Sequence, residues 1–513
     1  RAMVSYKRGV ERLVVKRRVT AAAVVVIIVG FGAIWYLLPS GFLPEEDQGY
    51  LMIAVNTPPS SSLQVTQKAI NQVDAIVRAR ADVESDAVVA GFDMLSGTAN
   101  TSSGVLFVRL KDFKERKLSS AEIATQLNQQ FSQTFQSFNC YAFIQPAIPG
   151  LGVTSGVTFA LLDTEGRGTG YLAENLSQLL DTLNSNPKFV AASSQFNDRV
   201  PQKRMEVDRQ HAMMKGVSLS SLYDELSALL GSRYIGNFTR FGRLYRSYIA
   251  AAPEYRQSEE ALNSYFITNG DGESIPLSSF VTVKDTVGVS FVEQFNLYNA
   301  AMVTVTPADG VSTTDAMGAI KGISEKVLPS DMTISWSGVS LLESREGGNR
   351  WVVYLVAILF VVLILAMLYE SWKLPLAIVL AVPLALLGAI LTIGVVHLFN
   401  NSIVNDVYMQ ISLVMLIGMA AKNSILVVEY EDREYRAGKS LTVATVDAAM
   451  LRARPIIMTA TAFILGVLPL VFASGVFHTA RNIMGISLVG GMIAATTIGL
   501  ILYPALYYMI RKL

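Results

Sequence analysis

The sequence predicts a membrane protein in which six helical spans accompany one large α+β domain outside the bilayer. Three observations support this fold class. Hydrophobic residues make up 51% of the 513 residues and charged residues only 16%, against about 25% charged in an average soluble domain. Six apolar blocks are long enough to cross about 30 Å of hydrocarbon. Between the first two blocks lies a long stretch of ordinary polarity, in which strand-like and helix-like patterns alternate.

The apolar blocks also indicate an orientation. Lys and Arg residues gather before the first block and between the fourth and fifth, whereas the two short loops on the opposite side carry only Arg481. Because positively charged loops stay in the cytoplasm, we expect a cytoplasmic basic helix at 1–18, a cytoplasmic loop at 429–454 and the large domain on the outer side. The predicted spans are 19–38, 352–369, 374–399, 407–428, 455–473 and 483–510.

The first part of the outer domain shows the order β-α-β-β-α-β, which is that of a ferredoxin-like unit. Strand patterns occur in "YLMIAVN", "VESDAVVAGF", "GVLFVRL" and "CYAFIQPA". Helical spacing occurs in "SSLQVTQKAINQVDAIVRA", where Val65, Ile70, Val73 and Val77 share one side, and again in "SSAEIATQLNQQFSQTF".

A second unit of the same kind begins at "GVTFALLD", continues with "GYLAENLSQLLDTLNSN" and breaks off after the strand "FVAASSQF". Its remaining elements follow much later, in "NAAMVTVTP", "TTDAMGAIKGISEKV" and "MTISWSG". The residues between them contain the helix "SLSSLYDELSALLG" and the hairpin-like "YIGNFTRFGRLYRSYIAA". We therefore expect an insert within the second copy of a duplicated unit.

Composition argues against several classes of function. A net charge of +1 gives no reason to expect a nucleic-acid partner. One cysteine, Cys140, and three scattered histidines do not suggest a soft-metal site. No nucleophile–base pair, phosphate loop or metal-ligand set is recognisable, so we expect neither an enzyme nor a cofactor.

A lysine, Lys422, lies inside the fourth apolar block, where it is the only ionisable side chain besides tyrosine. An ionised lysine at a helix centre costs about 2.5–3.5 kcal/mol, so it needs a partner or water. Asp406 and Glu429 lie at the two ends of the block, and no apolar block holds an acidic residue in its interior. Lys422 therefore either extends to the headgroups or pairs with carboxylates of helices outside this chain, which would form a proton-driven switch.

Two further polar residues accompany the fifth block. Arg452, with Arg454, fits an anchor of that helix at the inner membrane face. Thr459 lies seven residues after Arg452, on the same helical face. Its hydroxyl either contacts a proton or water, or bonds back to its own helix.

Four segments of the sequence resemble the resistance–nodulation–division (RND) transporters: "GFLPEEDQGY", "LYESWKLPLAIVLAVPL", "NDVYMQISLVMLIGMAAKNSILVVEY" and "AMLRARPIIMTATAFILGVLPLV". The resemblance covers essentially the whole chain and is strongest to the hydrophobe/amphiphile efflux branch, the acriflavine-resistance-B-like pumps. The chain looks like the C-terminal half of such a pump. Because it does not start with Met and the block 19–38 exceeds a signal-peptide core, we expect it to begin within a longer protein.

The resemblance implies a proton-driven antiporter in the inner membrane of a Gram-negative bacterium. In this family the lysine of the "AKN" motif pairs with two aspartates of the N-terminal half, which implies that role for Lys422 and relay roles for Arg452 and Thr459. It also implies export of amphiphilic drugs, dyes and detergents by a homotrimer that works with a periplasmic adaptor and an outer-membrane channel. No cofactor is implied beyond the proton gradient.

For the outer, periplasmic domain the resemblance implies three subdomains. A first porter subdomain covers 44–156, and a second covers 157–202 together with 292–340. A docking subdomain, 203–291, is inserted into the second. The region 352–510 then holds the last five spans.

The resemblance also locates a substrate pocket. In the family a glycine-flanked switch loop carries aromatic residues into the pocket, and the matching segment here is "AGFDMLSGTANTSSGVLF". Aromatic and methionine side chains give adaptable contact area that suits varied amphiphiles, although strand aromatics also serve as ordinary core. The implied pocket residues are Phe92, Met94, Phe107, Tyr141, Phe143 and Gln145.

The sequence departs from the family pattern at two pocket positions. Ala87 stands where close relatives carry a further phenylalanine, and Asp93 places a charge between Phe92 and Met94. The loop is also one residue longer. We therefore expect fewer aromatic walls and a preference for cationic substrates. Unchanged export of cationic dyes by an Asp93→Asn protein would count against that preference.

Two other functions stay open at this point. One is a metal- or lipid-exporting member of the same superfamily, for which the adjacent Met213 and Met214 are the only hint of a metal route. The other is a membrane-anchored binding or translocation accessory protein. Such a protein would need neither a buried Lys422 nor an aromatic pocket.

Overall fold

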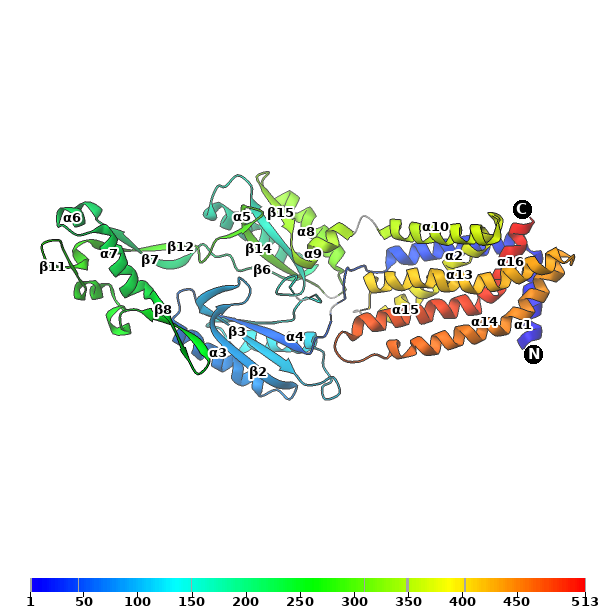
Figure 1. Ribbon diagram of the computed structural model, residues 1–513, viewed down its shortest axis with the longest axis horizontal. Coiled ribbons are helices and arrows are strands. Elements are labelled where there is room, and N and C mark those ends of the chain that lie inside the picture. Colours follow the sequence, from blue (N-terminus) through cyan, green and yellow to red (C-terminus); the bar gives the residue numbers. More distant parts are fainter. Residues whose placement is uncertain are drawn as a thin grey trace. The chain divides into compact units, whose positions relative to one another are not determined.

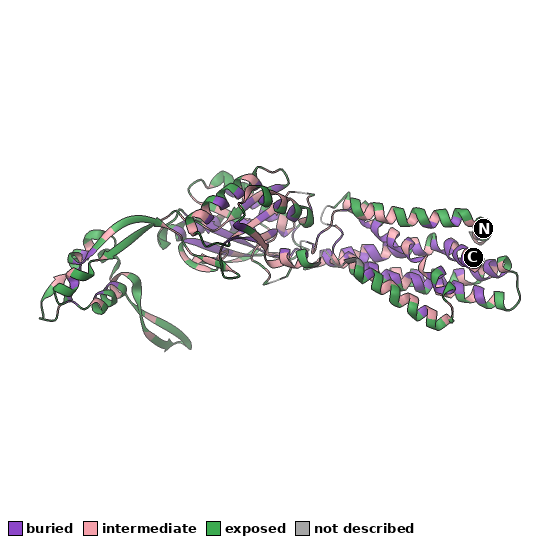
Figure 2. Cartoon of the chain, turned by 90° about the horizontal axis from the view of Figure 1, so that it is seen from above, coloured by how far each residue is buried: buried purple, intermediate pink, exposed green. Residues whose placement is uncertain are grey.

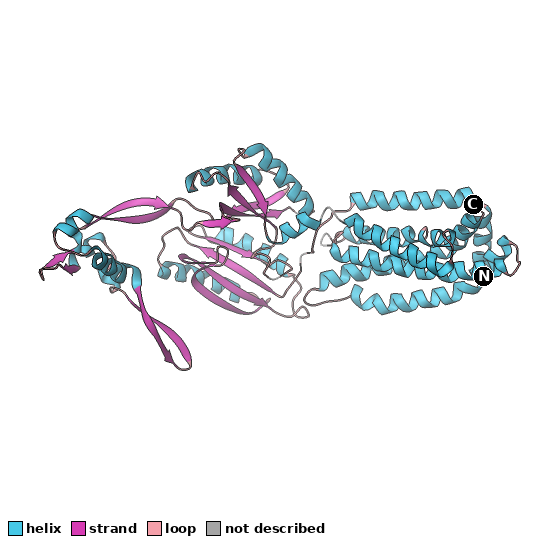
Figure 3. Cartoon of the chain, turned by 45° about the horizontal axis from the view of Figure 1, so that its top comes forward, coloured by secondary structure: helices cyan, strands magenta, loops and turns pink. Residues whose placement is uncertain are grey.

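The computed structural model describes residues 2–44, 46–148, 150–308, 310–346, 350–400 and 403–512. The chain folds into two compact units. Unit 1 consists of Arg1–Phe196 and Val292–Leu513, and unit 2 is Asn197–Phe291. The long apolar helices and two β-sheets belong to unit 1 (Figure 3).

Unit 1 contains a bundle of apolar helices that run side by side (Figure 1). Among the described residues, five stretches are long and apolar enough to cross a membrane, and a sixth results if the bent pair α15–α16 is one span. The helices are α2 (Arg17–Leu37), α10 (Arg350–Tyr369), α11 (Lys373–Val379), α12 (Val382–His397), α13 (Val407–Arg436), α14 (Leu441–Val471), α15 (His478–Thr497) and α16 (Gly499–Arg511).

Two helices differ from the blocks expected from hydrophobicity. α13 extends to Arg436 and α14 begins at Leu441, so most of the segment 429–454, expected to be a loop, is helical. Glu, Arg and Lys are good helix formers, so both helices continue beyond their apolar parts. The last block, 483–510, is divided by a bend of 58° between α15 and α16.

The centre of the bundle is formed by α12 and α13. In the most apolar part of each span, 61% of the residues are buried in α11–α12 and 56% in α13. The corresponding share is 11% in each of α2, α10 and α14 (Figure 2). Glycines allow α12 and α15 to approach closely. A Cβ atom added at Gly388 would lie 2.3 Å from the Cβ atom of Ala494, and one added at Gly490 would lie 2.1 Å from Oγ1 of Thr392. Close backbone approach of this kind is typical of helix pairs in membranes.

Helix α1 (Ala2–Val15) precedes the first apolar helix. Its valines Val10 and Val14 are buried against α14 and α16, whereas Lys7, Arg8 and Arg12 are exposed. A helix with one apolar side and one basic side is typical of a membrane surface.

The first sheet has the strand order β2-β3-β1-β4, and all its neighbouring strands are antiparallel. Leu51, Ile53 and Val55 of β1 pack against the two helices of this part, and the alternate residues Met52 and Ala54 belong to a separate cluster because side chains alternate along a strand. The elements are β1 (Tyr50–Asn56), α3 (Leu63–Arg78), β2 (Val83–Asp93), β3 (Thr98–Leu110), α4 (Ser120–Thr134) and β4 (Asn139–Phe143).

The second sheet repeats this order. β6 pairs with β14, β14 with β5 and β5 with β15, and a short strand β13 pairs with β14 as a hairpin. The chain of unit 2 lies between β6 and β13 in the sequence. The elements are β5 (Val157–Asp163), α5 (Thr169–Asn184), β6 (Phe189–Ser194), β13 (Glu293–Phe295), β14 (Tyr298–Pro307), α8 (Thr313–Val327), β15 (Met332–Trp336) and α9 (Gly338–Glu346).

Unit 2 has its own small core, which includes Leu222, Leu277 and Phe280. Strands β7 and β12 form an antiparallel pair, and β8 and β9 form the hairpin that the sequence predicted. The elements are β7 (Val200–Val207), α6 (Arg209–Met214), α7 (Leu219–Leu226), β8 (Arg233–Arg240), β9 (Arg243–Ile249), β10 (Phe266–Thr268), β11 (Ser274–Pro276) and β12 (Val281–Gly288).

Residues 39–44 and 46–48, here called the junction segment, connect α2 with β1. They form hydrogen bonds with the starts of α13 and α15. Asn405, just before α13, donates its N–H to the carbonyl oxygen of Pro39 at 3.1 Å. The buried carboxylate of Glu46 accepts hydrogen bonds from the N–H groups of Thr479 at 3.2 Å and Ala480 at 2.7 Å, at the start of α15. A carboxylate at a helix N-terminus also interacts favourably with the helix dipole.

The same segment is bonded to the first sheet unit. The buried Asp47 accepts hydrogen bonds from the Arg116 guanidinium and from the N–H of Ser120, both at 2.8 Å. Burial opposes the charge of Asp47, but the hydrogen bonds from Arg116, Gly49 and Ser120 outweigh it and hold the pKa of Asp47 below its usual value. The junction segment therefore joins the helix bundle to the first sheet through buried, charged hydrogen bonds.

Candidate functional site

Lys422 lies on an exposed stripe along α13. The stripe consists of Ile411, Met415, Gly418, Lys422 and Glu429, which repeat at helical spacing and are all exposed. A Cβ atom at Gly418 would meet nothing within 4 Å. Since the other sides of α13 pack against α12, α14 and α15, this stripe, here called the open stripe, is the side of α13 that this chain leaves uncovered.

No carboxylate of the described residues forms an ion pair with Lys422. The expectation that helices outside this chain supply its counter-charge stays a prediction. The lysine is the only basic residue of an otherwise largely apolar stripe, so a carboxylate that packs there would meet it in a low-dielectric environment.

The two other predicted relay residues lie on α14. The guanidinium of Arg452 stacks on the ring of Tyr430 at 5.1 Å, and its Nε atom is buried without a hydrogen-bond partner. The Thr459 hydroxyl donates to the carbonyl oxygen of Ile456 at 3.1 Å, as in the helix back-bonding alternative. Among the described residues, no hydrogen bond joins Lys422, Arg452 and Thr459.

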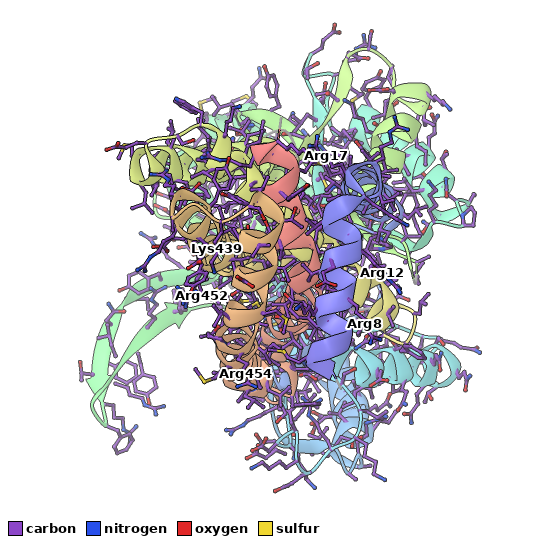
Figure 4. All side chains as sticks on the ribbon, turned by 90° about the vertical axis from the view of Figure 1, so that its right-hand side faces the viewer. Arg8, Arg12, Arg17, Lys439, Arg452 and Arg454 are labelled. Carbon is purple, nitrogen blue, oxygen red and sulfur yellow. The ribbon has the colours of Figure 1, made fainter. Side chains whose placement is uncertain are left out.

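The basic residues at one end of the bundle come from several helices. Figure 4 shows Arg8 and Arg12 on α1, Arg17 at the start of α2, and Arg452 and Arg454 on α14. The positive charge that the sequence concentrates in separate segments is thus gathered at one end of the helices, which is the distribution expected for the cytoplasmic side.

The first sheet brings four of the predicted pocket residues together. Phe92, Met94, Phe107 and Phe143 belong to one apolar cluster, whose central member is Met52 of β1. Met52 lies opposite Phe107 on β3 and opposite Phe143 on β4 in the strand register. The sequence predicted these four residues as pocket residues, and their contact with a substrate stays a prediction.

Tyr141 and Gln145 extend this cluster at the β4 side. The ring of Tyr141 stacks on that of Phe143 with 6.1 Å between centroids, and 45% of Tyr141 is exposed. The side-chain oxygen of Gln145 accepts a hydrogen bond from the Tyr50 hydroxyl at 2.7 Å. Burial raises the pKa of Tyr50, so this hydroxyl keeps its proton.

Ala87 lies opposite Phe107 in the β2–β3 register. The two residues line an open cavity of about 260 Å³ together with Tyr50, Ser85, Asp86, Val108 and Arg109. Because Ala87 has a small side chain, the cavity is bounded on that side by little more than backbone. Apolar walls with a few polar groups are typical of a small-molecule site.

Asp93 is turned toward the backbone of its own loop. Its side chain is buried, and Oδ1 accepts a hydrogen bond from the N–H of Leu95 at 3.0 Å. Asp93 therefore shapes the turn after β2. The expected preference for cationic substrates stays a prediction.

Sequence reasoning missed two members of this site, Met52 and Tyr50. The alternation in "YLMIAVN" places Met52 and Ala54 on the strand face that the helices do not cover, and this signal was available. The link between Tyr50 and Gln145 depends on the pairing of β1 with β4, which the sequence does not reveal. Among the described residues, no group of three or more His, Cys, Asp or Glu side chains is arranged to hold a metal ion.

The apolar helices and the aromatic cluster outside them define a multi-pass membrane protein with sheet-containing domains. Residues 1–511 match the AcrB/AcrD/AcrF family, and the chain belongs to this family of RND transporters.

Three relatives illustrate the similarity. The toluene efflux pump membrane transporter TtgB of Pseudomonas putida is 35% identical over 100% of this chain and 48% of its own length. The multidrug export protein AcrF of Escherichia coli K12 is 34% identical over 95% of this chain and 47% of its own. The multidrug resistance protein MdtF of Escherichia coli O6:H1 is 32% identical over the same shares. The chain thus spans about half the length of the curated relatives it matches.

Proposed function

We propose that the chain is the C-terminal half of a drug/proton antiporter driven by the proton-motive force. The complete pump exports amphiphilic drugs, dyes and detergents as the inner-membrane part of a tripartite efflux system. The names of the relatives support this, since they describe toluene efflux and multidrug export. The observation that carries the proposal is Lys422, exposed without a counter-charge on the open stripe.

Lys422 acts as one half of a proton-operated switch. Two aspartates of the N-terminal half pack on the open stripe and pair with its ammonium group. Protonation of an aspartate removes that attraction and leaves the lysine unpaired in low dielectric, which shifts the helices. Arg452 and Thr459 complete the relay from α14.

The aromatic cluster of the first sheet binds the transported compound. Phe92, Met94, Phe107 and Phe143 supply adaptable apolar contacts, and Tyr141 and Gln145 stand at the entrance side. The cavity beside Ala87 provides room for a larger ring system than a phenylalanine there would permit. Amphiphilic molecules fit such a site better than metal ions do.

The two sheet units are ferredoxin-like porter subdomains, 44–156 and 157–202 with 292–340, on the periplasmic side. The shared strand order of the two sheets supports this assignment. The insert 203–291 is the docking subdomain, through which a homotrimer meets an outer-membrane channel. A periplasmic adaptor protein completes the assembly. Met213 and Met214, which hinted at metals, lie in α6 of unit 2 and not in the aromatic cluster.

Efflux of a fluorescent cationic amphiphile by cells that carry the complete pump tests this function. We expect Lys422→Ala to abolish export, because the relay loses its positive charge. Lys373→Ala, which removes an exposed lysine at the start of α11, serves as the matched control and leaves export unchanged. Both variants must reach the membrane as trimers.

Normal export by the Lys422→Ala protein would contradict the relay. If the unaltered pump exports no amphiphile at all, the substrate assignment is wrong, and lipids or metals are the next compounds to test.

A further inference from the structure

A second ionisable residue of α13, Glu431, is buried inside this chain. Its residue exposure is 0%, and neither carboxylate oxygen has a hydrogen-bond partner among the described residues. An ionised carboxylate left without a partner costs several kcal/mol. Since Glu431 is covered by helices of this chain and does not belong to the open stripe, helices that pack on that stripe do not reach it.

The carboxylate of the next residue, Asp432, in contrast has ion-pair and hydrogen-bond partners within this chain. Asp432 is paired with Arg436 at 2.6 Å and Arg511 at 3.7 Å. It also accepts a hydrogen bond from the Tyr507 hydroxyl at 3.1 Å. Arg436 and Arg511 are therefore engaged by Asp432, and among the described residues Glu431 forms no ion pair.

A buried hydroxyl of the neighbouring helix α14 belongs to the same end of the α13–α14 pair as Glu431. α13 and α14 form an antiparallel hairpin with the short turn 437–440, so Glu431, five residues before the end of α13, lies level with Thr445 near the start of α14. The Thr445 hydroxyl is buried and has no partner.

The charge of Glu431 acts on two tyrosines of other helices. Tyr6 of α1 donates to the carbonyl oxygen of Leu500 at 3.0 Å, and burial first, then the charge of Glu431, raises the pKa of Tyr6. Tyr507 of α16 also lies within electrostatic range of Glu431. Tyr6 and Tyr507 are thus described titratable groups on which the charge of Glu431 acts, and Arg452 of α14 stacks on the adjacent Tyr430.

A further unpartnered hydroxyl lies between Glu431 and the level of Lys422. Ser424 is fully buried, its Oγ has no partner, and it precedes Glu431 by seven residues on the same helical face, about 10 Å along the axis. Ser424, Thr445 and Glu431 are thus three buried residues of α13 and α14 whose side-chain oxygen atoms have no partner among the described residues. Unpartnered buried oxygen atoms are commonly satisfied by internal water.

We propose that Glu431 is a proton-binding site through which protons leave the relay at Lys422 toward the cytoplasm. Its carboxylate takes up a proton from internal water on the Ser424 side and gives it to water near Tyr6, so that the carboxylate is restored after each transfer. A proton needs one lone pair, whereas a sodium ion needs a shell of several oxygens, and the unpartnered oxygens here are few. The role of Glu431 in proton release rests on the proposed antiport, but proton binding by Glu431 does not.

Infrared spectroscopy of the complete protein in liposomes tests the site. The unaltered protein is expected to show a protonated-carboxyl band that titrates with pH, which Glu431→Gln removes and Glu11→Gln, a change at an exposed carboxylate of α1, retains. Sodium chloride in place of potassium chloride is expected to leave the band unchanged. If Glu431→Gln fails to fold, Glu431→Asp is expected to keep a titrating band at a shifted frequency.

The proposal is overturned if Glu431→Gln or Glu431→Asp leaves the band as it was, or if sodium ions displace the proton. The release role is tested by drug-driven proton uptake into the same liposomes, where Glu431→Gln is expected to be slower by about tenfold and Glu11→Gln equal to the unaltered protein. Uptake at full rate by Glu431→Gln overturns that role. If Lys422→Ala also transports normally, the antiport proposal fails, while a band that depends on Glu431 still establishes the proton site.

Discussion

Two adjacent carboxylates of α13 show, at the scale of single residues, how the surroundings decide what a side chain does. Asp432 meets two arginines and a tyrosine hydroxyl, so it ties α13 to α16 as an ion pair. Glu431, one position earlier, has no hydrogen-bond partner at either carboxylate oxygen among the described residues. The same chemical group is structural in one place and available for proton binding in the other.

Asp406 provides a pH-dependent prediction at this scale. It lies just before α13, caps that helix by accepting the N–H of Met409 at 2.8 Å, and burial, with a smaller effect of Glu46, raises its pKa to about 7. A carboxyl whose folded pKa is raised contributes stability below its unfolded pKa and loses it as the pH rises through about 7.

We therefore expect Asp406→Asn, which keeps the helix cap, to match the unaltered protein near pH 4 and to be more stable above pH 7, by on the order of 1–4 kcal/mol. Thermal unfolding in detergent at several pH values measures this. A stability difference that does not change with pH would contradict the prediction.

The pocket provides a second residue-scale prediction. Phe107→Ala removes an aromatic wall between Met52 and the cavity, at a cost of about 1 kcal/mol of ligand contact, or roughly fivefold in affinity. We expect weaker export of large aromatic dyes and nearly normal export of small ones. Phe135→Ala, on the helix-covered side of the same unit, is the control. Equal losses for all substrates would indicate damage to the fold and not to a pocket.

At the scale of elements, the start of α15 depends on a side chain from a distant part of the sequence. Glu46 occupies the N-terminal end of this helix and satisfies two N–H groups that no residue of α15 itself can reach. The helix therefore takes its N-terminal partner from the junction segment, and its boundary cannot be read from its own sequence.

Glu46→Ala is expected to lower the free energy of unfolding by about 0.5–2 kcal/mol, the usual cost of losing a helix cap. Glu115→Ala, at an exposed site in the same unit, is expected to have almost no effect. Thermal unfolding of the complete protein separates the two. Equal stability of Glu46→Ala and the unaltered protein would show that water replaces the carboxylate without loss.

At the scale of the whole molecule, the open stripe is the exposed surface on which the proposed N-terminal half would pack. Gly418→Leu places a large side chain where the chain itself leaves free space, so it should not disturb the chain's own fold. It is expected to weaken association with a separately expressed N-terminal half by tenfold or more. Gly466→Leu on α14, which also meets nothing within 4 Å, is the control, and co-purification of the two halves is the measurement. Equal weakening by both variants would remove the stripe from the interface.

Much of the fold could be predicted because most apolar residues that repeat at strand or helix spacing are also buried in the structure. The alternation of β1 and the helical spacing of α3 correspond to one continuous buried core that includes Ile70, Val73 and Val77, whereas Val65, expected on the same side, is 50% exposed. A partner of Lys422 outside the chain stays a prediction. Glu431 could not be predicted in this way. It follows Glu429 and precedes a run of charged residues, so it looks like part of a solvated loop, and only the extension of α13 and α14 as helices buries it.

For the candidate pocket, too, local sequence predicts only part of the arrangement. The sequence predicted Phe92 and Met94 in a Gly- and Ser-rich loop, whereas Phe92 lies in β2, where it pairs with Ala99 of β3. Their role as pocket residues stays a prediction. The neighbour of Phe107 across the sheet, Ala87, and the cavity between them depend on strand register. Asp93 looked like a pocket charge, but its hydrogen bond to Leu95 is decided by the turn geometry.

The junction segment has a consequence for how movement of the helices reaches the sheet. It continues directly from α2, holds the start of α13 through Asn405 and the start of α15 through Glu46, and passes into β1 one residue after Gly49. A shift of all three helices together carries the segment along without changing its bonds. A displacement of α13 against α15 stretches it between two anchors and pulls on Asp47, and thus on Arg116 and α4. The sheet therefore responds to the difference between two helix positions, and a rigid tilt of the entire bundle leaves the bonding within the pocket unchanged.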